Sequence, residues 1–423
     1  MGLIRPGPIV GKMVNPYLAR RAGRQEVVYP HPSLEPVLER TLGVPLFQEQ
    51  LMRVAMVAAD FTGGEAQELR KAMSHKRSRE RMQRFVDRLR EGMDRKGFSP
   101  EAREEVILGI ESFAEYGFPE SHAASFALLV YASLWFKVHH PAVFLAALLN
   151  NQPMGFYAPA TLVKDAQRHG VRVRTPCVVE SEVGAKVTGD REVRLGLRSV
   201  IGLGDLAATR IVDARRERPF RDPADVCTRA GLDVRRAELL AEAGAFAALG
   251  VTRRQALWDV RAALASGGPL APPPKATGSP LPELTELQRT LADYASTGLT
   301  VGPHLVARMR RELDELGVTP SGQVPSRRHG SWIRVAGQVI VRQRPGTANG
   351  MVFVTVEDET GFANAVIDPD TFAEHRTLLL TSALLLVEGP LQNLDGVATV
   401  KGHAFRALGG PVEPALPRSH DFR

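Results

Sequence analysis

Cysteine is scarce in this sequence: only Cys177 and Cys227 occur among its 423 residues. Two distant cysteines form neither a CxxC pair nor a disulfide framework, which excludes the class of small disulfide-stapled secreted domains. The first ten residues also lack an apolar signal core. Together these features predict a cytoplasmic protein whose thiols stay reduced.

Long hydrophobic runs are missing as well. The most apolar stretch, residues 123–136, is shorter than the roughly 20 residues that a membrane span requires. We expect a helix buried in a protein core at this stretch, and no membrane partner. Hydrophobic residues make up 44% of the chain, which predicts folded domains rather than disorder. The length of the chain is enough for two to four of them.

The sequence contains no motif that by itself indicates a metal site or a nucleoside triphosphate site. There is no glycine-rich loop ending in Lys-Ser/Thr, and His, Cys and Asp do not recur at zinc spacing. Metal-dependent phosphoryl transfer needs clustered acids to hold Mg²⁺. The acidic groups at 357–359 and 368–370 fall at the ends of predicted strands, where a turn and a helix cap by Asp370 explain them. We therefore expect no catalytic residue and no metal ligand in this chain.

Positive charge is present and concentrated. The chain has 54 Lys and Arg against 47 Asp and Glu, a net charge of +7. Residues 70–96 alone contain 11 basic and four acidic side chains, and 11 minus 4 accounts for the whole excess. Such a stretch is either a surface for a polyanion or a solvated helix face, and charge alone does not separate the two.

The first 155 residues have a helical pattern. Thr62 and Glu65 form a capping box at the start of one helix. Basic side chains that could hold a triphosphate follow one to two turns later and just beyond, at Arg70, Lys71, Lys76 and Arg77. Ser121 is predicted to cap another helix, where the helix dipole would favour an anion beside His122. A solvated basic face and a structural histidine are the simpler interpretations of these two groups.

The strongest local signal is Val200-Ile201-Gly202-Leu203-Gly204, which precedes a predicted helix and resembles a helix-hairpin-helix. Gly202 and Gly204 would let the backbone approach a phosphate, and the helix start would present free N–H groups to it. Arg210 and Arg215 would add charge nearby. The alternative is an ordinary glycine-rich turn. A weaker copy at residues 230–233 lacks the second glycine, so we expect it to give structural support.

In the last third of the chain the spacing of apolar residues changes from a helical to a strand-like pattern. Residues 267–282 are rich in Pro and Gly and predict a linker. Short runs of alternating or apolar residues then predict strands at 333–337, 351–356, 363–367 and 384–389, with a helix from about 371 to 380. Five strands with one helix before the fourth is the wiring of an oligonucleotide-binding (OB) barrel. The predicted fold is therefore multidomain, mostly α-helical with tandem helix-hairpin-helix units, followed by a small all-β OB barrel.

Several motifs carry a more specific resemblance. Residues 2–8, 46–50, 69–73 and 116–124 look like the fingers of the bacterial C-family DNA polymerases, the alpha subunits of polymerase III. Residues 342–348 and 356–361, together with the ending at 418–423, are similar to the terminal barrel and C-terminus of their error-prone branch. The resemblance covers essentially the whole chain. It implies a fingers region at 1–155, tandem hairpins at 156–265, a linker and helical tether at 266–330, an OB fold at 331–408 and a tail at 409–423.

The resemblance also implies a function. In the intact family, template-directed synthesis supports damage tolerance, repair synthesis and induced mutagenesis. By analogy, incoming deoxynucleoside triphosphates would meet Arg70, Lys71, Ser121 and His122. Primer-template and single-stranded template DNA would meet the residues Arg5, Lys76, Arg77, Gly202, Gly204, Arg210, Arg215, Arg342 and Arg344.

Three departures from the family pattern bear on these expectations. One is that residues 175–180 replace a stretch that is usually rich in Asp and Asn. The family's palm, which carries the Mg²⁺-binding aspartates, precedes the motif at residues 5–8, so we expect this chain to be inactive alone. Lys71 stands where a second Arg is common, which loses bidentate phosphate geometry. We expect a palm-containing polypeptide and mutagenesis accessory proteins as partners. The alternatives are a stand-alone, non-catalytic DNA-binding module and a truncated gene remnant.

Overall fold

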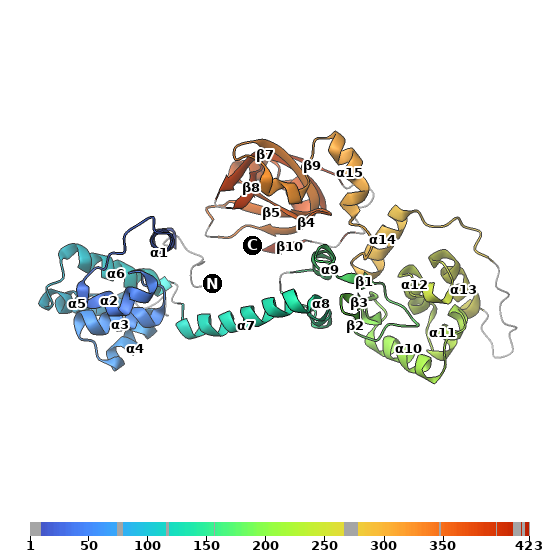
Figure 1. The fold of residues 1–423 in the computed structure, drawn as a ribbon, viewed down its shortest axis with the longest axis horizontal. Coiled ribbons are helices and arrows are strands. Elements are labelled where there is room, and N and C mark those ends of the chain that lie inside the picture. Colours follow the sequence, from blue (N-terminus) through green and yellow to red (C-terminus); the bar gives the residue numbers. More distant parts are fainter. Residues whose placement is uncertain are drawn as a thin grey trace. The chain divides into compact units, whose positions relative to one another are not determined.

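The computed structural model describes residues 10–73, 79–115, 118–155, 157–265, 278–346, 348–394, 396–408, 416 and 419–422. The chain divides into two compact units, Met1–Ser133 and Leu134–Arg423, and we describe each by itself (Figure 1).

The first unit is helical. Its described helices are α1 (Val10–Arg21), α2 (Glu35–Leu38), α3 (Gln48–Ala59), α4 (Gly63–Met73), α5 (Arg79–Arg95), α6 (Pro100–Glu115) and the start of α7 (Glu120–His139). Leu51, Leu69 and Leu89 come from three of these helices and are fully buried in one apolar core. The capping box is confirmed: the Glu65 N–H donates to Thr62 Oγ1 (3.3 Å), and the Thr62 N–H donates to Glu65 Oε2 (2.8 Å).

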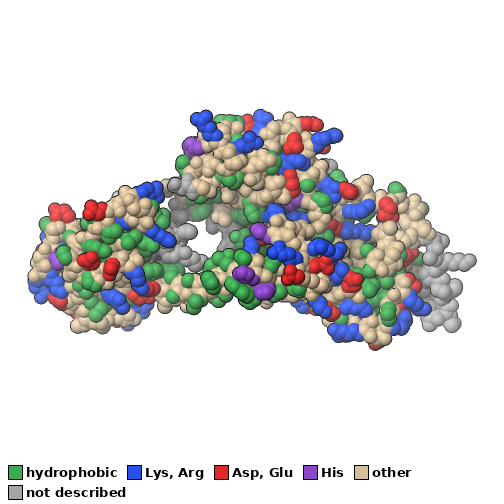
Figure 2. Space-filling view, in the orientation of Figure 1, with side chains coloured by type: hydrophobic (Ala, Val, Ile, Leu, Met, Phe, Trp, Pro, Cys, Tyr) green, Lys and Arg blue, Asp and Glu red, His purple; other side chains and the backbone are tan. Residues whose placement is uncertain are grey.

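Helix α7 contains the most apolar stretch, and our expectation that it is buried is wrong. None of its side chains is buried, and those of Leu128 and Tyr131 are 75% and 73% exposed. The apolar side chains along α7 are visible at the surface in Figure 2. The helix also begins at Glu120, one residue before the predicted cap Ser121, and the Glu120 N–H donates to Glu49 Oε2 (2.8 Å).

The second unit begins with helices around a small sheet. The elements are α8 (Pro141–Asn150), α9 (Pro159–Arg168), β1 (Arg172–Arg174), β2 (Lys186–Gly189), β3 (Glu192–Arg194), α10 (Asp205–Glu217), α11 (Pro223–Arg229), α12 (Val234–Glu242) and α13 (Arg253–Ala265). The sheet order is β1-β3-β2. Helices α10 to α13 share one core, in which Leu203, Ile211 and Phe246 are buried. The predicted linker falls partly outside the described residues, and α14 (Glu286–Thr297) and α15 (Leu305–Glu315) follow it.

A closed barrel completes the second unit. Its elements are β4 (Trp332–Gln343), β5 (Val352–Glu357), β6 (Phe362–Ile367), α16 (Pro369–Glu374), α17 (Arg376–Thr381), β7 (Leu384–Leu394), β8 (Val397–Lys401), β9 (Ala404–Ala407) and β10 (His420–Phe422). The order is β10-β4-β5-β6-β8-β7-β9, and β4 also pairs with β7. The first half of β4 pairs with β7 and the second half with β5, which closes the barrel. The OB wiring predicted from the strand spacing is confirmed.

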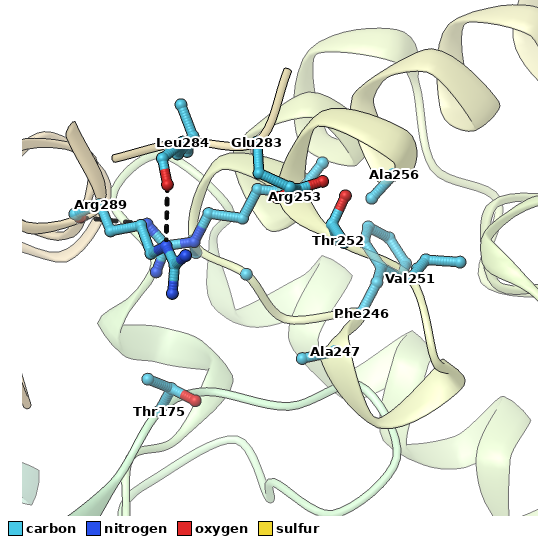
Figure 3. Close-up of a pocket in the computed structure, with 13 residues that line it drawn as sticks. Thr175, Phe246, Ala247, Val251, Thr252, Arg253, Ala256, Glu283, Leu284 and Arg289 are labelled. Atoms are coloured by element: carbon cyan, nitrogen blue, oxygen red, sulfur yellow. Dashed lines mark hydrogen bonds between the residues drawn. The ribbon is translucent and has the colours of Figure 1, made fainter. Parts of the chain in front are cut away.

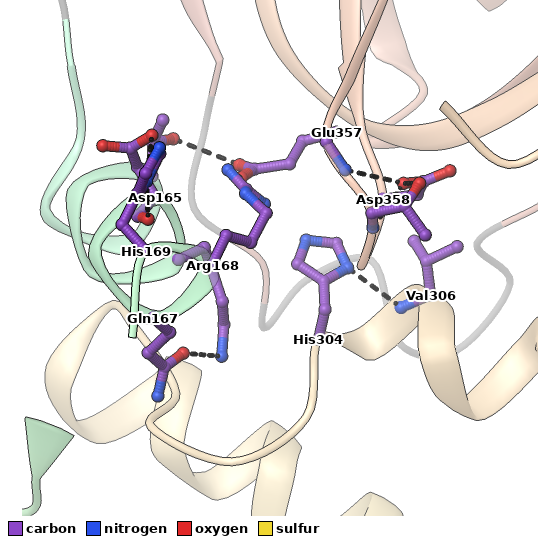
Figure 4. A network of polar contacts seen from close by, with 12 residues as sticks. Asp165, Gln167, Arg168, His169, His304, Val306, Glu357 and Asp358 are labelled. Carbon is purple, nitrogen blue, oxygen red and sulfur yellow. Dashed lines mark hydrogen bonds and ion pairs between the residues drawn. The ribbon is translucent and has the colours of Figure 1, made fainter. Parts of the chain in front are cut away.

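A buried polar network joins this barrel to α9 (Figure 4). Glu357, at the end of β5, is 2% exposed. Its carboxylate accepts hydrogen bonds from Arg168 (2.9 Å) and Thr161 (3.3 Å), both on α9. Burial raises the pKa of Glu357, and the Arg168 guanidinium opposes that shift. Because Arg168 is also mostly buried, this ion pair is largely removed from water.

Two further titratable groups belong to the network. Lys164 Nζ donates to Gln167 Oε1 (3.0 Å) and to the Gly302 carbonyl (2.5 Å), and burial lowers the pKa of Lys164 to about 8. His304 caps α15 by accepting the Val306 N–H at Nδ1 (3.2 Å). Burial lowers the pKa of His304 to about 3, so its imidazole is neutral near pH 7.

The acidic groups at 357–359 and 368–370 serve the fold. Asp358 is fully buried and accepts the backbone N–H groups of Ser321 (2.7 Å) and Thr360 (2.7 Å). Asp368, and not the expected Asp370, caps α16 through the Thr371 N–H (3.0 Å). Among the described residues, no group of three His, Cys, Asp or Glu side chains is placed to hold a metal ion. No helix in the described ranges combines the length and the apolar character that crossing a membrane requires.

Candidate nucleic-acid interface

The first hairpin presents an open helix start. Gly202 and Gly204 have φ values of 85° and 79°, and both are exposed. Gly204 is the N-cap of α10, and no side chain caps that helix. A Cβ on Gly204 would meet no atom within 4 Å, whereas the buried Leu203 between the glycines anchors the turn. No side chain occupies the N–H groups of the first turn of α10, and an exposed helix start of this kind can bind an anion.

The charged side chains around this turn differ in whether they form ion pairs. Arg210 is exposed and forms no ion pair within the described residues. Asp205 would repel an anion, but Arg198 holds its carboxylate with two hydrogen bonds of 2.8 Å and lowers its pKa. Figure 2 shows Lys and Arg side chains gathered over the part of the surface formed by α10 and α11. The free charge at the first hairpin is therefore positive.

Arg215 lies in the same helix but is largely buried. Its guanidinium donates to the carbonyls of Val178 (3.2 Å) and Ser181 (2.8 Å) and pairs with Glu182. As a DNA contact Arg215 stays a prediction, and its engaged donors favour a structural role.

The second hairpin is closed. Gly231 has a φ of 59°, but the N-cap of α12 is Asp233, whose carboxylate accepts the Arg236 N–H (2.8 Å). An acid that already caps the helix start leaves no free site for a phosphate. This geometry agrees with the expectation that the second copy supports the first.

A cavity of about 480 Å³ lies between the α12–α13 turn and residues 283–289 (Figure 3). Arg253 and Arg289 point into it, which suggests a site for an anion. However, Arg253 is paired with Asp293, Arg289 donates to the Leu284 carbonyl, and Glu283 adds a negative charge to the lining. The two guanidinium groups are thus already engaged within the chain.

The predicted nucleotide-binding residues of the first unit lie in two helices. Arg70 Nε donates to Gln67 Oε1 (3.1 Å) and Lys71 pairs with Glu68 (2.7 Å), both within α4. Ser121 and His122 are exposed in the first turn of α7. The His122 ring packs between those of Phe118 and Phe126, with centroids 5.4 and 4.5 Å away.

The assignments of these four residues to a nucleotide stay predictions. Arg5, Lys76 and Arg77 lie outside the described residues, and their roles stay predictions as well.

Two predicted arginines lie in the barrel and differ sharply. Arg342 is 9% exposed and donates to the carbonyls of Leu379 (2.6 Å) and Ser382, so its geometry favours holding the barrel together. Arg344 is exposed in the β4–β5 connection and lies over the Phe372 ring at 5.3 Å. Both stay predictions as DNA contacts, and Arg344 has the more accessible guanidinium.

The outer face of β5 and β6 has groups that no sequence motif indicated. Phe353 is 39% exposed, and Thr355 Oγ1 donates to Asn364 Oδ1 across the two strands (2.8 Å). An aromatic ring beside polar groups on this pair of strands is typical of OB folds that stack unpaired bases. The valines at 352, 354 and 356, which recur with period two and are buried, were the signal that could have placed Phe353 on the outer face.

Comparisons with known proteins agree with this geometry. Residues 1–97 match the bacterial DNA polymerase III alpha subunit finger domain, residues 170–256 a helix-hairpin-helix motif, and residues 333–406 an OB-fold nucleic acid binding domain. One solved structure, asparaginyl-tRNA synthetase from Pyrococcus horikoshii, covers 20% of this chain and 23% of its own at 21% identity. Its TM-score of 0.17 is too low to inform the fold.

Curated relatives match the chain over its whole length. Error-prone DNA polymerase 2 of Agrobacterium fabrum is 47% identical, and the error-prone DNA polymerases of Mycolicibacterium paratuberculosis and Methylococcus capsulatus are 46% and 43% identical. In each case the alignment covers all of this chain but only 39–43% of the relative. The chain thus spans about two fifths of the length of these relatives. With its finger, helix-hairpin-helix and OB regions, it belongs to the error-prone branch of the bacterial polymerase III alpha subunit family.

Proposed function

We propose that this chain is the DNA-holding and nucleotide-positioning part of an error-prone, DNA-directed DNA polymerase that acts in translesion and repair synthesis. The open start of α10 at Gly204, beside the unpaired Arg210, is the observation that carries the proposal. Backbone N–H groups and one free guanidinium bind phosphates and do not recognise base sequence. The duplex is held by its backbone, as an enzyme that copies any template requires.

The chemistry itself needs groups from elsewhere. In the intact polymerase Mg²⁺ supplies the charge that phosphoryl transfer requires. Glu357, Asp358 and Asp368 do not fit such a site, because they are engaged with arginines, hydroxyls and backbone N–H groups, and no group of three His, Cys, Asp or Glu among the described residues is placed to hold a metal ion. In this proposal, a palm-containing polypeptide supplies the metal ligands and accessory proteins bring the assembly to damaged DNA. This chain positions the deoxynucleoside triphosphate and the primer-template.

Duplex binding tests the proposal directly. We expect Gly204→Ala to weaken binding of a labelled duplex about tenfold in fluorescence anisotropy, because a Cβ and a strained φ would spoil the phosphate approach. Gly250→Ala is the control for adding a Cβ at a positive φ away from the hairpin. Gly250 has a φ of 78° and a ψ of 13°, and likewise no atom within 4 Å of an added Cβ. Because Gly204 has a ψ of 149°, where alanine is more strained, thermal melts of both variants accompany the titrations. Equal affinities of the two variants would remove the hairpin from the interface.

Charge provides an independent test of the same site. Arg210→Ala should lower affinity uniformly across duplex sequences and reduce the slope of log K against log salt by about one. Arg216→Ala is the control on the same helix, since Arg216 is 67% exposed but already pairs with Asp213 and Glu182. A strong preference of the wild-type chain for one duplex sequence would contradict binding through phosphates.

Primer extension separates this proposal from a stand-alone DNA-binding module. With Mg²⁺ and all four nucleotides, the purified chain should bind primer-template without extending it. Adding a palm-containing polypeptide should restore extension. Binding that never supports extension with any such partner would favour the non-catalytic module.

A further inference from the structure

A second cavity, of about 470 Å³, lies beside β4 and β7, and no residue of β5 or β6 is among the described residues that line it. Among its lining residues are Trp332 and Arg334 of β4, Glu388 of β7, and Arg327 and Ser331 of the segment that leads into β4. Its volume is in the range of pockets that hold small ligands.

Trp332 is exposed and yet held in place. Its side chain is 58% exposed, while its indole N–H donates to Glu388 Oε1 (2.7 Å). The His403 ring stacks on the indole, with centroids 5.6 Å apart and planes 19° apart. His403 does not line the cavity, so this stacking leaves the cavity side of the indole available. An aromatic ring fixed in this way loses little entropy when a flat ligand stacks on it.

The charges of the lining favour an anionic ligand. Glu388 is neutralised by Arg334, whose Nε donates to Glu388 Oε2 (2.7 Å), and this hydrogen bond is the main cause that lowers the pKa of Glu388. Arg327 is exposed and has no ion pair within the described part of the chain. The charges of Arg334 and Glu388 cancel, so the guanidinium of Arg327 gives the edge of the cavity one net positive charge.

We propose that this cavity binds one unpaired nucleotide of a single-stranded nucleic acid, with the base stacked on Trp332 and the adjoining phosphate at Arg327. An aromatic platform beside a free cation is the usual means of binding single strands without reading sequence. The inference rests on the proposed function and adds a contact that a strand crossing the β5–β6 face would not make. It assigns the strand a second position on the barrel, along β4 and β7.

Anisotropy titrations of the full chain with a labelled twelve-residue oligo-dT and with a duplex of the same length test this site. We expect Trp332→Ala to weaken binding of the single strand about tenfold, since base stacking on an aromatic side chain is lost, and to leave binding of the duplex unchanged. Trp332→Phe keeps a ring and should stay within about threefold of the wild type.

Arg327→Ala should lower affinity for the single strand, whereas Arg328→Ala is the control, because Arg328 is also exposed but does not line the cavity.

Each outcome bears on the proposal in a defined way. Unchanged binding of oligo-dT by Trp332→Ala would overturn the site and leave the hairpin function intact. A wild-type chain that binds the duplex but not oligo-dT would also overturn this site alone. Binding of neither would overturn the proposed function as well. If Trp332→Ala unfolds at a lower temperature than the wild type, the comparison of Arg327→Ala with Arg328→Ala tests the site instead. Equal losses of affinity for oligo-dT in these two variants would overturn the proposal.

Discussion

Helix α7 and the network around Glu357 show opposite relations between polarity and burial. The helix exposes large apolar side chains such as Leu128 and Leu129, 75% and 61% exposed. The network buries a carboxylate, an ammonium and an imidazole between α9, α15 and β5. Glu357 and Lys164 can be buried because each has polar partners at hydrogen-bonding distance. The side chains of α7 stay exposed because no described neighbour covers them. Burial therefore follows the available partners as much as residue type.

Removing one partner of the buried pair should have the largest effect. Arg168→Ala leaves the Glu357 carboxylate buried without its cation, which we expect to cost about 3–5 kcal/mol of the unfolding free energy of the second unit. Urea denaturation followed by circular dichroism measures this loss. The double variant Arg168→Ala with Glu357→Gln should recover part of it, because the carboxylate that lost its guanidinium partner is then replaced by a neutral amide. A matched control is Arg311→Ala, since the Arg311–Glu315 pair is 92% and 72% exposed and should contribute little. Similar effects of the two single variants would contradict the comparison.

Acid should weaken the network through His304. Its pKa is about 3 in the folded chain and near 6.5 in an unfolded one, so between these values the unfolded chain binds more protons. The unfolding free energy should therefore fall as pH drops from about 6.5 to about 3, by at most about 1.4 kcal/mol per pH unit from this residue.

His304→Asn is the comparison variant, since Asn can still cap α15 but does not titrate. The pH dependence of the wild type minus that of the variant isolates the histidine, because the raised pKa of Glu357 acts in both proteins. A difference that does not change with pH would show that His304 is not held neutral by burial.

Polar substitution on α7 should have the smallest effect. Leu128→Gln exchanges a side chain that is already in water, so we expect the unfolding free energy to change by less than about 0.5 kcal/mol. The control is Leu89→Gln, which places an amide in the fully buried core of the first unit and should cost several kcal/mol. A large loss of unfolding free energy in Leu128→Gln would mean that Leu128 is buried. The contrast between an exposed α7 and the buried network would then fail.

Local patterns allowed much of the fold to be predicted from sequence. The Thr62–Glu65 capping box and the barrel strands depend on residues close together in the chain, and the structure confirms both. The burial of α7 was predicted wrongly, because its apolar composition says nothing about which partner surfaces the fold provides. The helix cap near residue 370 was misplaced by two residues, since Asp368 and Asp370 are equivalent by composition.

The candidate site was harder to predict than the fold. Gly202 and Gly204 were visible as a motif, but the difference between Arg210 and Arg215 was not. Arg215 is engaged by carbonyls more than 30 residues away in sequence, a contact that no local pattern encodes. Trp332 was missed for the same reason, because its partners Glu388 and His403 lie more than 50 residues further along the chain.

Strand β10 pairs with β4 and so covers an edge of the barrel that would otherwise be open. Residues 420–422 lie parallel to Val341, Arg342 and Gln343, on the half of β4 that has already left β7. Arg342 reinforces this pairing through Ser419 and Asp421. Without this short strand, β4 would present unpaired N–H and C=O groups, which are a template for a strand from another molecule. Removing residues 419–422 would therefore favour self-association through that edge, even though the apolar core of the barrel would be untouched.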